Sequence, residues 1–207
     1  PSLVGSEMCI RDRPRFESAE VGNLELTWLV PLSLIGTICG WLYFVSEHAS
    51  EALAHAIGER PVVKAMLAGL ALAICGTVLP YTMFAGETQA DVLMETYLTI
   101  PAGVLIATGL VKAMLTPALI NLGWRGGHFF PVIFSGVSLG YGLAILTGAD
   151  PVFCVAICTA STMGAVMRQP VMVVGLLLMC FPLKGIVCMI IAAVIAAGIP
   201  LPKPLRK

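Results

Sequence analysis

The residues best suited to chemistry in this chain surround a glycine pair that leads into an apolar run of helical length. The segment consists of Gly126, Gly127, His128, Phe129, Phe130 and Pro131. The first N–H groups of a helix have no partner within the helix and lie at the positive end of its dipole, so they bind anions through the backbone alone. Glycines let a ligand approach closely, and Pro131 costs nothing in a first turn. The sequence therefore predicts an anion site built from main-chain amides.

The elements that must position this segment are long apolar runs, and their composition indicates a membrane. Hydrophobic residues make up 58% of the 207 residues and charged residues 12%, whereas soluble domains average about 45–50% apolar and ~25% charged residues. The net charge is zero, and the aromatic residues do not alternate with Lys or Arg, which excludes a nucleic-acid-binding surface. We expect an all-α, polytopic transmembrane protein.

The first part of the chain predicts three spanning helices, at residues 28–45, 62–79 and 97–120. Residues 46–61 predict a separate amphipathic helix at the membrane surface, and residues 80–93 predict a polar turn. Small residues spaced by four suit the second span for close packing against another helix. They are Ala65, Gly69 and Ala73.

The second part predicts helices at residues 130–147 and 152–167, the latter capped by Asp150. The sequence Arg168-Gln169-Pro170 then interrupts the apolar region. The next apolar run, 171–181, is too short to span a bilayer alone, and Pro182 ends it before a further run at 185–199. Short, interrupted apolar segments point to discontinuous helices around a site near the middle of the membrane.

The residues of these motifs resemble those of the CLC family of chloride channels and chloride/proton antiporters. Gly127-His128-Phe129-Phe130-Pro131 resembles the G-x-F-x-P signature of that family, and residues 110–127 resemble its preceding helix and loop. Arg168-Gln169-Pro170 matches its R-x-P break. The resemblance implies the second of two inverted repeats with broken and re-entrant helices, and a missing N-terminal half that carries the gating glutamate.

The resemblance also implies roles for single residues. The anion-binding set is Gly127, His128, Phe129 and Phe130. Main-chain amides of His128 and Phe129 face the central anion, and Gly127 gives clearance with a backbone φ that a Cβ would penalise. The side chain of His128, where the family mostly has an aliphatic residue, either packs or makes transport sensitive to pH.

The resemblance also bears on one charged residue within a span and on two differences from the family pattern. These are Lys112, and Met179 and Arg206. Lys112 lies within an apolar run, so it reaches the interface or points into protein or a watery cavity. The family often has a basic residue here, which adds the alternative that Lys112 biases the local field toward anions. Met179 replaces a common glutamate, as in a divergent bacterial branch, and Arg206 falls near the position of the family's pore tyrosine.

The chain divides into three parts on this interpretation. Residues 2–13 resemble a translated sequencing adapter, so we expect residues 1–27 to be non-native or flanking. Residues 28–202 form the transmembrane half, and the basic tail 203–207 lies in the cytoplasm of a bacterial cell, below its plasma membrane. The resemblance implies a homodimer that transports chloride or a similar anion. We expect its contacts in the Ala-rich run 186–199, at Ala192, Ala196 and Ala197.

Three rival interpretations are weaker. Gly136–Gly140 fits the G-x-S-x-G elbow of serine hydrolases, but Ser138 lies in an apolar helical run with no later His, so we expect no enzyme. Another secondary transporter with discontinuous helices would favour intramembrane carboxylates, yet Asp150 is the only acid after Tyr97. Neither Cys154 and Cys158 nor the other cysteine and histidine spacings indicate a metal or cofactor site.

Overall fold

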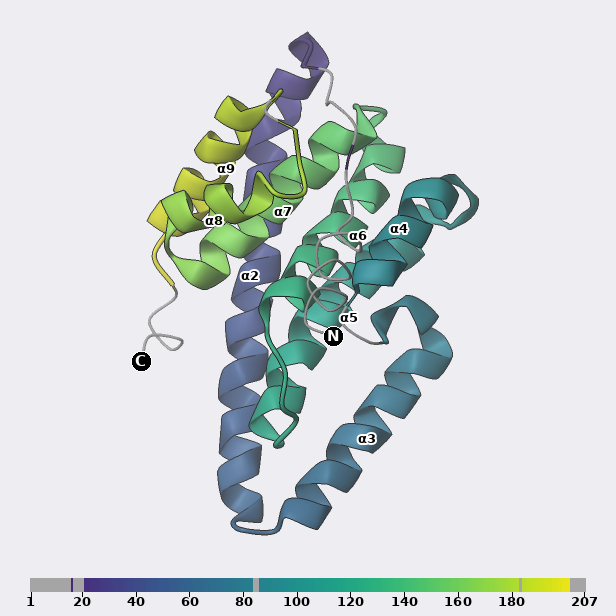
Figure 1. Cartoon of the computed structure of the whole chain (residues 1–207), viewed down its shortest axis with the longest axis vertical. Coiled ribbons are helices and arrows are strands. Elements are labelled where there is room, and N and C mark those ends of the chain that lie inside the picture. Colours follow the sequence, from purple (N-terminus) through teal and green to yellow (C-terminus); the bar gives the residue numbers. More distant parts are fainter. Residues whose placement is uncertain (1–15, 17–20, 84–85, 183, 202–207) are drawn as a thin grey trace, which may run out of the picture.

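The computed structural model describes residues 16, 21–83, 86–182 and 184–201, and these contain helices and no β-strand. The all-α prediction is confirmed. The helices form an elongated bundle from which α3 diverges (Figure 1). In chain order the elements are α2 (Asn23–Ile57), α3 (Pro61–Val78), η1 (Pro80–Thr82), α4 (Glu87–Thr96), η2 (Tyr97–Thr99), α5 (Ala102–Asn121), α6 (Phe129–Thr147), α7 (Pro151–Met167), α8 (Pro170–Leu177) and α9 (Ile186–Gly198).

The longest helix, α2, has 35 residues and merges two predicted elements. The separate surface helix predicted at residues 46–61 is wrong, because no Gly or Pro lies between Gly40 and Gly58 to end the helix at its polar part. The helix also begins inside the segment predicted as flanking, at Asn23. At 1.5 Å per residue α2 is about 52 Å long, which exceeds the ~30 Å hydrocarbon core of a bilayer. One end of α2 must therefore project into water.

Hydrogen bonds to α5 fix the polar, projecting half of α2 against that helix. The Ser46 hydroxyl donates to the Met114 carbonyl at 2.5 Å, and the Asn121 side chain donates to the Glu47 carbonyl at 3.0 Å. Asn121 also donates to the Ser50 hydroxyl at 2.9 Å. These polar contacts explain why the helix continues past its apolar part.

The predicted span at residues 62–79 is confirmed as α3, but its small-residue face has no partner within the described part of the chain. Ala68 is its buried residue, while Ala65 and Ala73 are exposed. A Cβ added at Gly69 would meet nothing within 4 Å. This face is therefore uncovered by the described residues.

The polar turn predicted at residues 80–93 is wrong, since this stretch contains η1 and most of α4. The prediction failed because α4 buries few apolar side chains, among them Ala90 and Leu93 at i and i+3. Gly86 starts α4 with φ of 104°, and a Cβ there would lie 2.6 Å from the Cβ of Phe134. Only glycine fits this left-handed turn against α6.

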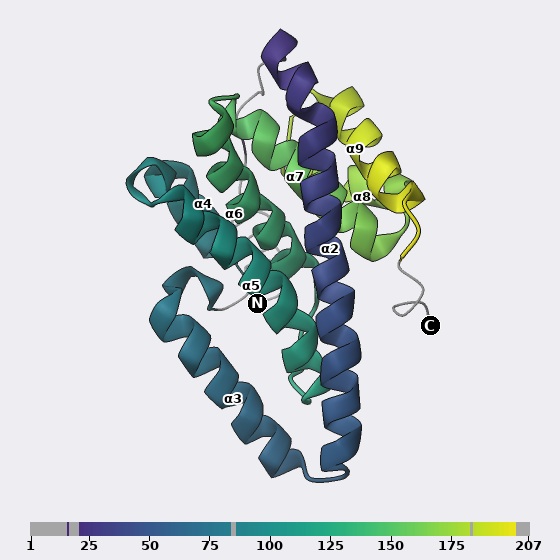
Figure 2. The same cartoon turned by 180° about the vertical axis from the view of Figure 1, so that it is seen from behind.

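The core forms where α5, α6 and α7 pack together beside α2, as both views show (Figures 1 and 2). Helix α6 is buried from Val132 to Ala144. Gly136 and Gly140 of α6 let α7 approach so closely that an added Cβ would overlap backbone atoms of Thr159 and Val155. Small residues that admit close backbone contact are typical of helix packing in membranes.

The break predicted at Arg168-Gln169-Pro170 is confirmed, and it separates α7 from the short helix α8. Arg168 ends α7 with φ of 57°, the left-handed conformation of a helix C-cap. Its Nη1 donates to the carbonyls of Ala197 and Ile199 at 3.2 and 2.9 Å, at the end of α9. The guanidinium therefore ties the broken segments together.

The alanine face of α9 does not have the exposure that we predicted for a subunit contact. Ala192 and Ala196 are fully buried, and the backbone of neighbouring Ala193 approaches Gly164 of α7. These small side chains serve packing within the chain. The outward face of α9 carries larger residues instead, namely Val187, Ile190, Ile191 and Val194.

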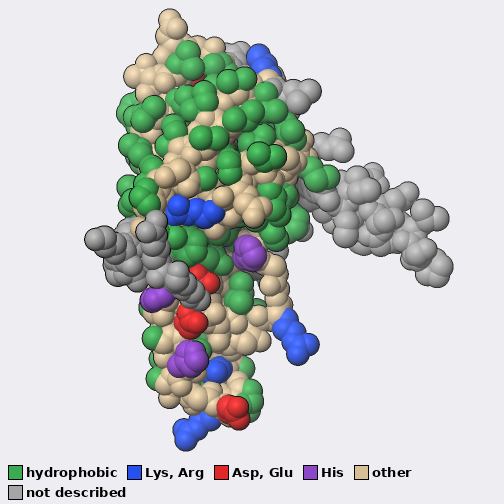
Figure 3. All heavy atoms as spheres, turned by 90° about the vertical axis from the view of Figure 1, so that its left-hand side faces the viewer, with side chains coloured by type: hydrophobic (Ala, Val, Ile, Leu, Met, Phe, Trp, Pro, Cys, Tyr) green, Lys and Arg blue, Asp and Glu red, His purple; other side chains and the backbone are tan. Residues whose placement is uncertain are grey.

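The surface agrees with insertion in a membrane. Four helices of the described part are long and apolar enough to cross a bilayer, namely α2, α3, α5 and α6. Figure 3 shows hydrophobic side chains over the upper part of one face and charged and histidine side chains toward the lower end. The polar half of α2 and the turn into α3 carry Glu51, His55, Glu59 and Arg60.

Candidate functional site

The predicted anion segment begins where α5 ends in a glycine turn. Gly123 has φ of 99°, and its N–H donates to the Ile120 carbonyl at 3.0 Å. The N–H of Trp124 donates to the Leu119 carbonyl, also at 3.0 Å. This pair of bonds is the Schellman arrangement that satisfies the last carbonyls of a helix. The chain then runs without regular structure to His128, the N-cap of α6.

The first turn of α6 leaves main-chain donors unpaired. The N–H of Val132 donates to the His128 carbonyl at 3.2 Å, and Pro131 has no N–H. The positive end of the α6 dipole adds to the field of these donors. Amides that make no hydrogen bond within the described residues are those of Gly127, His128, Phe129 and Phe130. The structure thus brings the four predicted residues together at one helix end.

Gly127 provides space, although not for the conformational reason that we predicted. Its φ is not in the left-handed region, which is occupied at Gly123 instead. A Cβ added at Gly126 or Gly127 would meet nothing within 4 Å. The glycine pair therefore leaves an open approach to the amides, and the expectation of a positive φ at Gly127 is wrong.

The side chain of His128 packs on its neighbour. The rings of His128 and Phe129 stack with centroids 4.6 Å apart and planes 22° apart. The histidine makes no side-chain capping bond to α6. Of the two predicted alternatives, this geometry favours packing.

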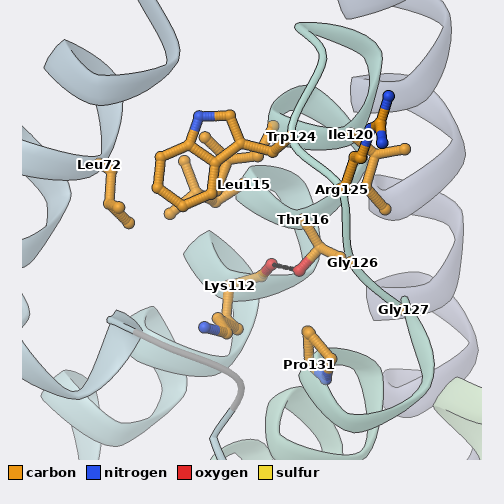
Figure 4. Close-up of a pocket in the computed structure, with 11 residues that line it drawn as sticks. Leu72, Lys112, Leu115, Thr116, Ile120, Trp124, Arg125, Gly126, Gly127 and Pro131 are labelled. Atoms are coloured by element: carbon orange, nitrogen blue, oxygen red, sulfur yellow. Dashed lines mark hydrogen bonds between the residues drawn. The ribbon is translucent and has the colours of Figure 1, made fainter. Parts of the chain in front are cut away.

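A cavity of about 260 Å³ lies beside the glycine loop, between α3, α5 and the start of α6 (Figure 4). Its walls are mostly apolar, and its polar side chains come from α5 and the loop. The indole of Trp124 lies over the cavity opposite Leu72 of α3 (Figure 4). The lining residues are Leu72, Lys112, Leu115, Thr116, Leu119, Ile120, Trp124, Arg125, Gly126, Gly127 and Pro131.

Lys112 is buried beside this cavity and does not reach the interface. Only 4% of it is exposed, and its Nζ donates to the Thr82 carbonyl at 2.7 Å. The Nζ also lies 6.0 Å from the ring centroid of Phe134. Thr108 and Thr116, one turn away on either side, are buried as well. Of the alternatives predicted for Lys112, the structure shows the one in which it points into protein beside a cavity.

The sequence prediction missed Trp124, Arg125 and Thr82 as parts of the site. Arg125 carried a usable signal, because it is the only Lys or Arg between Lys112 and Arg168 and directly precedes the glycine pair. The role of Thr82 had no such signal, since its carbonyl meets Lys112 across 30 residues.

The G-x-S-x-G motif is part of the helix packing and not a nucleophile elbow. Ser138 lies in the middle of α6 with no exposed surface, and its hydroxyl donates to the Leu105 carbonyl of α5 at 2.8 Å. The flanking glycines are the ones that contact α7. An elbow would require the serine to be exposed on a strained turn after a strand.

Apolar spanning helices, broken helices and unpaired amides at the start of α6 define a multi-pass integral membrane protein of the ion-transport type. The chain belongs to the voltage gated chloride channel family, because residues 3–200 match the sequence model of that family. The predicted family resemblance is confirmed.

A solved structure supports the same fold. The crystal structure of a CLC-type fluoride/proton antiporter superposes with a TM-score of 0.75 at 21% sequence identity. The match covers 94% of this chain and 50% of that one, so the chain spans about half the length of this neighbour. A comparison with curated proteins gave no match.

Proposed function

We propose that this chain forms one half of an anion-transport pathway, in which main-chain amides at the start of α6 bind the ion. The observation that carries this proposal is the set of unpaired amides from Gly127 to Phe130, which adjoins an open cavity. Gly127, the first residue of this set, and Pro131, which follows the last, both line the cavity. Membership of the chloride channel family supports the same assignment.

Neutral donors suit transport better than a full charge at the binding position. An ion that moves through a pathway must be held firmly enough to lose water and weakly enough to leave. Amides and a helix dipole meet both needs, because each carries only a partial charge. Transport of this kind requires no covalent chemistry, so we propose no enzymatic reaction.

Lys112 supplies a positive charge beside the cavity without binding the ion tightly. Its ammonium is held on the Thr82 carbonyl, 2.7 Å away, and cannot move freely toward the amides. A fixed cation in a low-dielectric setting favours anions over cations in the cavity. This geometry agrees with the predicted alternative in which Lys112 biases the local electric field toward anions.

The transported ion is chloride or a similar small anion. The structural neighbour is described as a fluoride/proton antiporter, so fluoride and a coupled proton flux are the first alternatives to measure. A cation-coupled transporter fits less well, because Asp150, the only acid after Tyr97, accepts the Phe153 amide at 2.7 Å as the cap of α7.

The proposal extends to a second repeat, a membrane location and a contact between two copies of the chain. The neighbour is about twice as long, so a second repeat with its own helix ends completes the pathway. The protein resides in a bacterial plasma membrane, with its basic tail, residues 203–207, outside the described residues and in the cytoplasm. Two copies pair through the outward face of α9, so Val187 and Val194 replace Ala192 as the positions for cysteine crosslinking.

Removal of one main-chain donor tests the proposed site in a full-length protein that carries both repeats. Replacement of the amide between His128 and Phe129 by an ester deletes the Phe129 N–H and keeps both side chains. A lost hydrogen bond to a charged group costs roughly 1.5–3 kcal/mol, or about 10- to 150-fold in anion affinity. Anion flux and binding are measured in liposomes, and Phe129→Pro is expected to show the same loss.

Phe129→Leu is the matched control, because it changes the side chain and keeps the donor. It should keep affinity within about 3-fold, since the binding group is the backbone. Full affinity and selectivity in the ester variant would contradict binding by the amide.

A further inference from the structure

We propose that Arg125 is the capture residue of this site, the side chain that draws anions from water into the cavity before the amides bind them. The inference rests on the proposed function. Arg125 is exposed and lines the cavity directly before Gly126 and Gly127. Within the described part of the chain its guanidinium makes no hydrogen bond or ion pair, so its charge is not neutralised there.

The two cations that line the cavity have different positions. Figure 4 shows the Arg125 side chain at the opposite end of the cavity from Lys112, with the glycine loop between them. Lys112 is buried and bound to the Thr82 carbonyl, whereas Arg125 is exposed on a loop. An exposed cation at the mouth of a site acts on ions still in solution, and a buried one acts on ions already inside.

Charged side chains of α2 lie near the end of α5 that leads to Arg125. Glu47 and Glu51 lie on the half of α2 that contacts the end of α5. The Asn121 side chain bonds the Glu47 carbonyl and shares a small cavity with Glu51. Asn121 precedes Arg125 by four residues. Lys64 and His55 line the same small cavity as Glu51, so charges of both signs lie at this end of the molecule, and Arg125 is the charged side chain there that lines the cavity beside the amides.

Coulomb's law gives the size of the effect. Arg125 and Gly127 are two residues apart, which is about 7 Å of extended chain. A unit charge at that distance changes the local anion concentration about 3-fold at a dielectric constant of ~80 and about 50-fold at ~20. Steering of this kind disappears when the Debye length falls to ~3 Å, near 1 M salt.

The test is the ionic-strength dependence of anion flux through the full-length protein in liposomes, at subsaturating chloride or fluoride, with potassium gluconate to set the ionic strength. Arg125→Gln should lower flux at least about 3-fold at ~0.01 M ionic strength and match the unchanged protein near 1 M. Arg125→Lys should remain within about 2-fold throughout. Arg60→Gln is the control, since Arg60 is an exposed N-cap residue about 18 Å along α3 from Leu72.

The outcomes separate this inference from the proposed function. Equal flux for Arg125→Gln and the unchanged protein at low ionic strength would overturn the capture role. A loss that persists near 1 M and is shared by Arg125→Lys would also overturn it, because the guanidinium would then act by direct contact or structure. If the ester at Phe129 lowers affinity while Arg125→Gln has no effect, the amide site stands and only the capture role fails. If the ester has no effect, the proposed function itself fails.

Discussion

At Gly127 the missing side chain matters for space and not for backbone conformation. Its φ lies outside the left-handed region, and no atom lies within 4 Å of the position of a Cβ. The residue could be singled out from the sequence because residues 127–131 resemble the G-x-F-x-P signature of the family, whereas a glycine pair before a helix is common. Its conformation could not, because φ depends on where α5 ends, and Gly123 provides the turn there.

Gly127→Val should abolish anion transport in the full-length protein and leave its folding unchanged. The branched side chain fills the open approach to the amides, while the backbone accepts a Cβ without strain. Chloride and fluoride flux in liposomes, with thermal unfolding as a check, measures both effects. Normal flux with a normal unfolding temperature would show that ions do not pass this point.

His128→Ala should keep anion selectivity, because the amide of His128 is unchanged and its ring only stacks on Phe129. A modest loss of stability, about 0.5–1.5 kcal/mol, is expected from the removed ring contact. The measurement is the permeability ratio of chloride to fluoride and to gluconate. If selectivity disappears, the imidazole and not the backbone is the ligand.

At the scale of elements, hydropathy predicted the apolar helices well and their ends less well. The breaks around Arg168 and Pro170 were visible because they combine a charge and a proline within apolar runs. The continuity of α2 could be read from the absence of Gly and Pro between Gly40 and Gly58, whereas its support by α5 and the existence of α4 depend on contacts with distant residues. The side chain of Asn121 donates a hydrogen bond to the polar half of α2, and Phe134 packs against the turn at Gly86.

Close packing of α6 on α7 predicts opposite effects for two glycine substitutions. Gly136→Ala should destabilise the protein by about 1–3 kcal/mol, because its Cβ would overlap the backbone of Thr159. Gly175→Ala, in α8, meets nothing within 4 Å and should be neutral or stabilising by up to about 1 kcal/mol. Thermal unfolding in detergent compares them. Equal effects would mean that α6 and α7 do not pack as closely as described.

At the scale of the whole molecule, the chain spans about half the length of its structural neighbour. The chain covers 50% of its structural neighbour, and α3 leaves its small-residue face open. The cavity beside the amides is bordered on one side by α3, which contacts the rest of the chain little. The family resemblance predicts an N-terminal half beyond this chain, but the sequence did not predict which surfaces are uncovered within the described residues.

The 207-residue chain alone should insert in membranes without conducting anions. Four apolar helices suffice for insertion, whereas a pathway between inverted repeats needs helix ends from both. The chain is reconstituted in chloride-loaded liposomes, and efflux is measured at about one copy per vesicle. Addition of the other repeat as a separate chain should restore selective efflux, because each repeat contributes its own donors. Selective efflux from the chain alone at that density would show that α6 and its neighbours already enclose a complete pathway.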